Sequence, residues 1–355
     1  MKKVLSIASA RPNFVKLAAV HHALALRPDE FQHIIIHTGQ HYDPLLSDVF
    51  FEQLKIPQPA FNLGVHGGTR EEVIEATKIE LLKKLPLIEP DIILVYGDVN
   101  GALGAAEAAK EAGIRLAHVE AGLRSFDLSM PEEHNRLAID RLANILLCSE
   151  KSGVENLKKD PEVQGEIHLV GNTMIDTLMR MMPFIDQIEL PSRIPLPTFV
   201  VCTIHRPSNV DSREMLEKNL HFISEIAEIL PVILPAHPRL RTSMERYHLK
   251  ADNIEIIEPL SYLEFLKVSS MSECIITDSG GIQEEAVWLH KRCFTLRPNT
   301  ERPSTIESGS NVLIDPENVD DRQKVLEFAK NPVDPAITIP DFWDRHTGER
   351  IAGIL

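Results

Sequence analysis

The sequence predicts an α/β protein built from two doubly wound, Rossmann-like domains that face each other across a cleft. Short apolar runs alternate with amphipathic stretches along the whole chain, which is the pattern of βαβ units and parallel sheets. The chain has 355 residues, which is long for one compact core. It contains about twelve strand candidates, too many for one open sheet of ordinary width.

The elements follow from the position of each apolar run. The first run ends at Arg11-Pro12, which stops a strand and opens a helix. The expected strands are 3–9, 32–38, 91–97, 114–119, 145–149, 166–170, 198–204, 231–236, 253–257, 273–277, 292–296 and 311–314. The expected helices include 12–27, 71–85, 99–112, 131–143, 213–230, 261–271 and 281–291.

A change in composition suggests where the domains meet. Gly171-Asn172 is followed by four prolines between 183 and 197, and such segments are typical of linkers. We therefore expect an N-terminal domain over 1–171 and a C-terminal domain over 172–340. A last helical segment, 341–355, is expected to pack back on the first domain.

Charge and cysteine usage exclude several classes of function. The net charge is -15, which argues against general binding to nucleic acid or to anionic membranes. No apolar run has the ~20 residues needed to cross a bilayer, so we expect no membrane insertion and a cytoplasmic location. The four cysteines are far apart, without a CxxC pair, and are expected to be buried free thiols: Cys148, Cys202, Cys274 and Cys293.

The run from Thr277 to Ala286 is the most informative segment. Gly280 and Gly281 stand between a short apolar strand and a helix-like stretch, so the backbone can approach a ligand closely. The start of a helix offers unpaired N–H groups and a positive dipole end, which suit a phosphate. The structural alternative is a capped helix, with Asp278 or Ser279 as N-cap and Glu284 or Glu285 closing a capping box.

Polar residues also follow most of the other predicted strands. In a doubly wound fold such residues gather at the carboxyl edge of the sheet, where ligands bind. Each has a structural alternative: Asp98 as a helix N-cap, His118 as a core histidine bonded to backbone, His237 as a turn residue, Arg11 as a solvated helix start and Arg124 as an ion-pair partner of Glu120. Eight such positions together predict a polar site rich in Arg, His and carboxylates.

Four motifs together carry a resemblance. The segments HVEAGLRS (118–125), PEEHNR (131–136), TIHRPSN (203–209) and DSGGIQEE (278–285) resemble those of the non-hydrolysing UDP-N-acetylglucosamine 2-epimerases. The similarity extends over nearly the whole chain. It implies a glycosyltransferase-B-like arrangement of the two domains and epimerisation at C2 of a UDP-sugar, without a metal or nicotinamide cofactor.

The resemblance also implies roles for individual residues. Asp98, Glu120 and Glu132 match the family's catalytic carboxylates, and His205 matches a histidine that acts near the diphosphate. Matching binding residues, or polar residues at strand ends beside them, are Arg11, Lys16, Arg136, His237, Ser279, Gly280, Gly281, Glu285 (for the ribose) and Arg302. Family members are commonly dimers, so a homodimer is expected.

Some motifs depart from the family pattern and leave alternatives open. The usual GDTxS/T reads Gly97-Asp98-Val99-Asn100 here, and the stretch 42–48 lacks the second Gln linked to an allosteric site. Segments such as 37–43 and 125–130 look similar to a sister group that epimerises UDP-2,3-diacetamido-glucuronic acid. We favour UDP-GlcNAc as the substrate. A hydrolysing 2-epimerase, a GT-B glycosyltransferase and a non-catalytic sensor of nucleotide sugars are the rival hypotheses.

Overall fold

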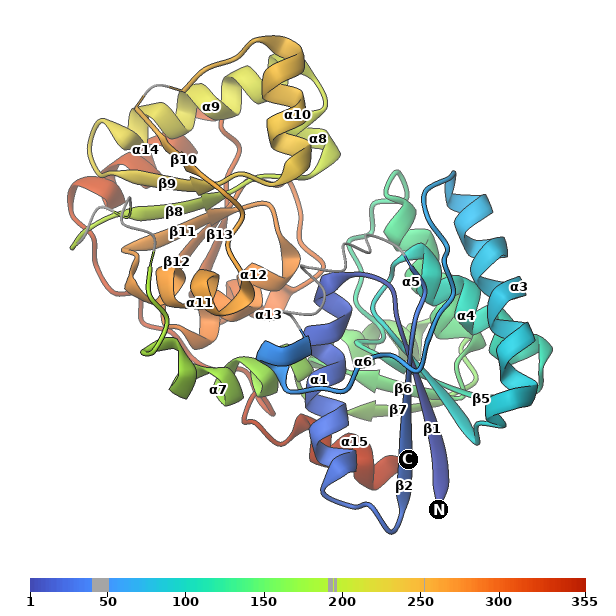
Figure 1. The fold of residues 1–355 in the computed structure, drawn as a ribbon. Coiled ribbons are helices and arrows are strands. Elements are labelled where there is room, and N and C mark those ends of the chain that lie inside the picture. Colours follow the sequence, from blue (N-terminus) through green and yellow to red (C-terminus); the bar gives the residue numbers. More distant parts are fainter. Residues whose placement is uncertain (40–50, 191–193, 195–196, 252) are drawn as a thin grey trace. The chain divides into compact units, whose positions relative to one another are not determined.

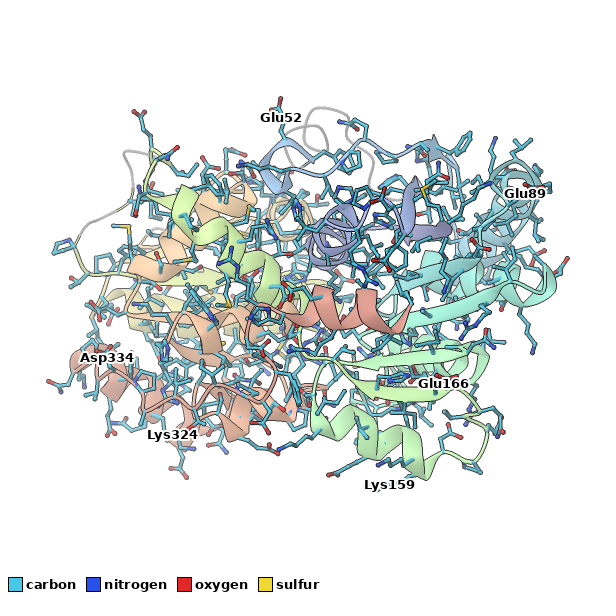
Figure 2. The ribbon with its side chains drawn as sticks, turned by 90° about the horizontal axis from the view of Figure 1, so that it is seen from below. Glu52, Glu89, Lys159, Glu166, Lys324 and Asp334 are labelled. Atoms are coloured by element: carbon cyan, nitrogen blue, oxygen red, sulfur yellow. The ribbon has the colours of Figure 1, made fainter. Side chains whose placement is uncertain are left out.

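The protein folds into two compact units. The computed structural model describes residues 1–39, 51–190, 194, 197–251 and 253–355. Unit 1 comprises Met1–Arg180 and Pro340–Leu355, and unit 2 comprises Met181–Ile339. No helix in these described ranges is long and apolar enough to cross a membrane. Charged side chains such as Glu89, Glu166 and Lys324 point away from the ribbon into solvent (Figure 2).

Unit 1 is built on a parallel sheet with the strand order β3-β2-β1-β4-β5-β6-β7 (Figure 1). Its strands are β1 (Lys2–Ala8), β2 (Phe31–His37), β3 (Phe61–Asn62), β4 (Ile92–Tyr96), β5 (Arg115–Val119), β6 (Ile145–Cys148) and β7 (Glu166–Leu169). The central strands are continuous apolar runs, and every residue of β4 is buried. This pattern is typical of parallel sheets that are covered on both faces.

The helices between these strands are α1 (Arg11–Ala25), α3 (Arg70–Ile88), α4 (Asn100–Glu111), α5 (Pro131–Leu142) and α6 (Lys151–Lys159). Helix α7 (Thr173–Ile185) follows β7 and extends into unit 2, and α15 (Thr347–Ile354) belongs to unit 1. Helix α3 begins with a capping box, in which the Thr69 side chain accepts from Glu72 N and the Glu72 side chain accepts from Thr69 N. Residue 171, the expected end of the N-terminal domain, lies just before α7. The first turns of α7 bond to unit 1, for example through Thr177 Oγ1, which donates to Val15 O at 2.7 Å.

Unit 2 has a second parallel sheet with the order β10-β9-β8-β11-β12-β13. The strands are β8 (Val200–Thr203), β9 (Val232–Pro235), β10 (Glu255–Ile257), β11 (Cys274–Thr277), β12 (Arg292–Thr295) and β13 (Asn311–Leu313). The helices are α8 (Pro207–Val210), α9 (Arg213–Ala227), α10 (Pro238–Tyr247), α11 (Tyr262–Met271), α12 (Gly280–Trp288), α13 (Pro303–Glu307) and α14 (Val319–Lys330).

Alternate residues of β8 enter two separate cores, one on each face of this sheet. Val200 and Cys202 pack with residues of α9 such as Leu220, whereas Val201 packs with Val268 of α11 and Ala286 of α12. Helices therefore cover both faces. The prediction of two doubly wound α/β domains is confirmed, although the two-residue strand β3 was not expected from the sequence.

The C-terminal helix α15 packs on α1 within unit 1. Arg27 Nη1 donates to Ala352 O at 2.7 Å, and Asp176 Oδ2 accepts from Gly348 N at 2.8 Å. Burial raises the pKa of Asp176 to about 6, although hydrogen bonds from Gly348 and Thr347 oppose the shift. A Cβ at Gly348 would lie 2.3 Å from Ala19 O. Only glycine allows this approach of the two helices.

We expect Gly348→Ala to lower the free energy of unfolding by about 1–3 kcal/mol, because the added methyl group overpacks the contact with α1. Gly353 in the same helix is the control, since a Cβ there meets nothing within 4 Å. Gly353→Ala should leave the stability unchanged or raise it slightly through helix propensity. Urea unfolding measures both, and equal effects of the two substitutions would contradict this packing.

A pair of half-buried histidines lies between α1 and β2. The Nδ1 atoms of His21 and His33 are 3.0 Å apart, so one nitrogen donates and the other accepts. His33 Nε2 lies 2.8 Å from Ser6 Oγ, which lies 2.7 Å from the Tyr96 hydroxyl. Burial, with repulsion from His22, lowers the pKa of His21 to about 4, and burial, with repulsion from His21, lowers that of His33 to about 3. Both rings are therefore neutral in the folded state at neutral pH.

This pair predicts a loss of stability in mild acid. The unfolded chain binds protons below the ordinary histidine pKa of 6.5, whereas the folded pair excludes them until about pH 4. The histidine contribution is therefore complete above pH 6.5 and is lost as the pH falls below it. His33→Gln removes one linked group and keeps a polar contact to Ser6. The urea midpoint of this variant should fall less steeply between pH 6.5 and 4 than that of the wild type, and equal slopes would contradict the assignment.

Candidate active site

In unit 1, a buried ion pair lies at the carboxyl edge of the sheet. Lys16 of α1 pairs with Glu120, which follows β5, and both side chains are more than nine-tenths buried. Glu120 has φ 71°, a strained conformation for a residue other than glycine, and such strain is common at functional sites. Gly97 lies beside the pair: a Cβ there would be 3.1 Å from Lys16 Nζ and 3.4 Å from Glu120 Oε2. A larger residue at 97 would crowd both charged groups.

Asp98, the next residue after Gly97, forms a second ion pair. Arg136 Nη2 of α5 lies 2.5 Å from Asp98 Oδ2. The guanidinium is held from its other side by Glu133, 2.6 Å from Nη1, and Glu133 in turn accepts hydrogen bonds from Ser125 N and Oγ, both at 2.9 Å. Asp98 remains one-quarter exposed. The buried guanidinium of Arg136 therefore holds the Asp98 carboxylate in place at the surface.

Glu132 and Glu133 are neighbours with opposite environments. Glu133 is buried and bonded to the loop before α5, so it is a structural carboxylate. Glu132 is exposed in the first turn of α5, one helical turn before Arg136 and on the same face. The structure thus leaves Glu132, and not Glu133, open to a ligand.

His118 supports the backbone of this edge. Its ring is fully buried, with Nδ1 2.6 Å from Asp140 Oδ1 and Nε2 2.9 Å from Gly97 O. Asp140 also pairs with Arg124 Nη1 at 2.7 Å. Both ring nitrogens are engaged, which confirms the expectation of a core histidine bonded to backbone. Arg124 pairs with Asp140, whereas Glu120 pairs with Lys16.

In unit 2, helix α12 begins at the double glycine. Ser279 is the N-cap residue, but its side chain makes no capping hydrogen bond, and no acidic residue occupies the first turn. The capping-box alternative is therefore wrong, and the first N–H groups of α12 are not satisfied by a side-chain cap. These groups and the helix dipole make the turn a candidate anion site.

Arg302 packs directly against this turn. A Cβ at Gly280 would lie 2.3 Å from Arg302 Nη1 and 2.8 Å from Glu301 Oε1. Arg302 is buried; its Nε lies 3.1 Å from Glu284 Oε1, and its Nη1 pairs with Glu301. Glu301 also pairs with Arg297 Nη2 at 2.7 Å. A buried network of alternating charges thus fixes a guanidinium at the start of α12.

A buried carboxylate links the loops after β8 and β11. Asp278 Oδ2 accepts hydrogen bonds from His205 N at 2.9 Å, Arg206 N at 2.8 Å and Asn209 Nδ2 at 3.0 Å. Burial alone would raise the pKa of this carboxyl group, but His205, Asn209 and the Arg206 N–H lower it to about 2. His205 Nδ1 lies 2.9 Å from Asp278 Oδ1, while the side chain of His205 is 38% exposed.

Two further predicted residues lie around this edge. The ring centroids of His205 and His237 are 5.3 Å apart, so the structure brings these histidines together. Glu285 is buried in α12 beside Tyr262. Burial raises the pKa of Glu285 to about 8, although the Tyr262 hydroxyl lowers it in part. Glu285 is therefore largely protonated at neutral pH.

Most of the chain matches one protein family. A family model described as UDP-N-acetylglucosamine 2-epimerase matches residues 23–355. The chain belongs to this 2-epimerase family.

Relatives and solved structures agree with this assignment. A UDP-N-acetylglucosamine 2-epimerase of Methanocaldococcus jannaschii is 36% identical over 375 residues, covering 99% of this chain and 98% of the relative. A crystal structure of a UDP-GlcNAc 2-epimerase from the same organism, in complex with UDP-GlcNAc and UDP, matches with a TM-score of 0.89 at 36% identity and covers 100% of this chain and 99% of that one. A UDP-2,3-diacetamido-2,3-dideoxy-D-glucuronate 2-epimerase of Pseudomonas aeruginosa is 38% identical over 318 residues, 88% of each chain.

Not every 2-epimerase residue expected from the sequence can be placed. The side chain of Arg11 lies outside the described residues, and so does the segment 40–50, which contains the stretch 42–48 that departs from the family pattern. Gly281 is half-buried in the first turn of α12. Asp278, Glu301 and Asp140 were not singled out as site residues. The available signal for Asp278 was its position directly after a buried strand and before the double glycine.

We expect Gly280→Ala to lower the free energy of unfolding by about 1–3 kcal/mol, because the methyl group would displace a buried, ion-paired guanidinium. A double-mutant cycle with Arg302→Met isolates the contact. The cost of Gly280→Ala should be smaller when Met replaces Arg302. Additive effects of the two substitutions in urea unfolding would mean that Arg302 does not pack against the glycine.

Proposed function

We propose that this 2-epimerase interconverts UDP-GlcNAc and UDP-ManNAc by inverting C2 of the hexose, and that its product supplies cell-surface polysaccharide. The main supporting observation is the separation of two chemistries. Unit 1 presents carboxylates on buried cations, and unit 2 presents a helix N-terminus with a buried arginine. The first set suits proton transfer and the second suits a diphosphate.

The chemistry of the substrate explains why both sets are needed. The C2 proton is not beside a carbonyl group and is hardly acidic, so direct abstraction is unfavourable. Departure of UDP with the C1–O electron pair gives an oxocarbenium-like state, from which loss of the C2 proton yields 2-acetamidoglucal. Protonation at the opposite face and return of UDP to C1 give the epimer. The route is redox-neutral and needs no nicotinamide or metal.

We assign the diphosphate to unit 2. The first N–H groups of α12, those of Gly280 and Gly281, bind it where negative charge grows as the C1–O bond breaks, whereas Ser279 N already donates to Thr277 Oγ1 at 3.0 Å. Arg302 lies beneath the turn, and its charge is largely compensated by Glu284 and Glu301, so it fixes the turn more than it attracts the ligand. Glu285, mostly protonated, donates to a ribose hydroxyl or accepts from it.

We assign proton transfer at C2 to the carboxylates of unit 1. Asp98 and Glu120 are each oriented by a buried cation, Arg136 and Lys16 respectively. Glu132 is exposed one turn before Arg136 and supplies a third carboxylate. Two faces of the sugar ring must exchange a proton, so more than one acid–base group is required.

A second substrate has comparable support. The P. aeruginosa diacetamido-glucuronate 2-epimerase is 38% identical to this chain and the M. jannaschii UDP-GlcNAc 2-epimerase is 36% identical, so identity does not separate the two substrates. The two UDP-sugars differ only in the groups at C3 and C5, and the chemistry at C2 is the same. We also propose a cytoplasmic homodimer, which light scattering of the purified protein tests; a monomer would contradict it.

Proton NMR in D₂O tests the reaction directly. UDP-GlcNAc and its 2,3-diacetamido-uronate analogue are each incubated with the protein. Epimerisation gives the manno isomer with deuterium at C2 and UDP still attached. Release of free UDP would indicate a hydrolase, and binding without C2 exchange would indicate a sensor. Reaction only in the presence of an added sugar acceptor would indicate a glycosyltransferase.

We expect Asp98→Asn, Glu120→Gln and Glu132→Gln each to reduce kcat by about 10²-fold or more, the usual size of an acid–base contribution. Glu166→Gln is the control, because Glu166 is exposed on β7 and is given no role. Its kcat should equal that of the wild type. Wild-type turnover in all three carboxylate variants would refute the assignment of proton transfer to unit 1.

A further inference from the structure

The strongest unassigned feature is a carboxylate–imidazole pair, Asp278 and His205, in unit 2. The three donors to Asp278 Oδ2 are two backbone N–H groups and the Asn209 amide. Oδ1 accepts no hydrogen bond of regular geometry from the described residues, and the group that faces it is His205 Nδ1, at 2.9 Å. Three hydrogen bonds therefore hold Oδ2 in place, and Oδ1 faces the histidine.

An ionised carboxylate can only accept hydrogen bonds. The nitrogen that faces it, His205 Nδ1, must therefore carry a proton. The other nitrogen, Nε2, is then the one that a ligand meets, and the side chain is 38% exposed. The low pKa of Asp278, about 2, keeps this arrangement over the whole neutral range.

Two other histidines of the chain show what is particular to this pair. His237 lies 5.3 Å away, centroid to centroid, but its Nδ1 accepts from Arg239 N at 3.2 Å, so its neutral ring carries the proton on Nε2. His118 in unit 1 also faces a buried carboxylate, Asp140, yet its Nε2 is closed off by Gly97 O at 2.9 Å. His205 combines a carboxylate beside Nδ1 with a partly exposed ring whose Nε2 has no hydrogen bond to the described residues.

We infer that Asp278 is the positioning residue of His205: it fixes the ring and the Nδ1–H tautomer so that Nε2 faces the diphosphate of the substrate. The inference rests on the proposed function only in naming the diphosphate. Asp278 itself touches no substrate, because it is fully buried. It acts through the imidazole, as a carboxylate does when it holds a catalytic histidine in one tautomer.

Asp278→Asn is expected to reverse the tautomer of His205. The three N–H donors require an oxygen at the Oδ2 position, so the amide nitrogen of Asn must take the Oδ1 position. That nitrogen donates to His205 Nδ1 and moves the ring proton to Nε2. The substitution thus changes the tautomer while it keeps the loops bonded.

The first measurement is the tautomer of His205, read from ¹H–¹⁵N NMR of histidine-labelled protein and assigned with His205→Asn. The wild type should carry its proton on Nδ1, and Asp278→Asn should carry it on Nε2. Asn209→Ala is the matched control: it removes one donor from the same carboxylate but not the contact with the ring, so Nδ1–H should persist. A wild-type ring protonated on Nε2 would overturn the inference, even if Asp278→Asn does not fold.

The second measurement separates positioning from a structural role. Asp278→Asn should reduce kcat by about 10²-fold or more, while KM and the Kd for UDP change by less than about threefold, since binding does not depend on the tautomer. In a His205→Asn background the same substitution should reduce kcat by less than about threefold. An equal loss in both backgrounds would show that Asp278 acts on the fold and not through His205.

The two measurements also distinguish this inference from the proposed function. A wild type with the Nδ1–H tautomer that does not exchange the C2 proton in D₂O would refute the epimerase and leave the pair intact. A protein that epimerises with His205 protonated on Nε2 would refute the pair and leave the epimerase intact.

Discussion

The candidate site in unit 2 depends on one buried carboxylate. Removing the charge of Asp278 from water is costly unless hydrogen bonds replace the lost solvation. Three N–H groups do so at Oδ2, from the loop after β8 and from α8, and His205 Nδ1 lies 2.9 Å from Oδ1. Because those partners lie about seventy residues earlier in the chain, the carboxylate holds two distant loops together at the same sheet edge. The start of α12 is placed immediately after it.

The same physical rule explains unit 1. At the carboxyl edge of its sheet, buried cations are paired with carboxylates, Lys16 with Glu120 and Arg136 with Glu133 and Asp98. Each cation is buried, while the carboxylate of Asp98 reaches the surface. Breaking a buried pair leaves an uncompensated charge, which is strongly destabilising. The pairs therefore stabilise the sheet edge and at the same time present carboxylates in fixed positions.

Much of the fold could be predicted from the sequence, because the alternation of apolar runs and amphipathic helices is strong. The two-residue strand β3 could not, since it is too short for any periodicity. Asp98 and Gly280 were predictable as strand-end residues. The difference between Glu132 and Glu133 was not readable from spacing, as it depends on the loop around Ser125 folding over Glu133. The pairing of Asp278 with His205 also required the structure, because only the sheet order makes β8 and β11 neighbours.

Our central proposal is that the turn between β11 and α12 binds the diphosphate of a UDP-sugar through its backbone N–H groups. A crystal structure of the protein with UDP tests this most directly. We predict phosphate oxygens within hydrogen-bonding distance of Gly280 N or Gly281 N, with the ribose at Glu285 and an oxygen near His205 Nε2. UDP bound elsewhere, with this turn in contact only with water, would contradict the account.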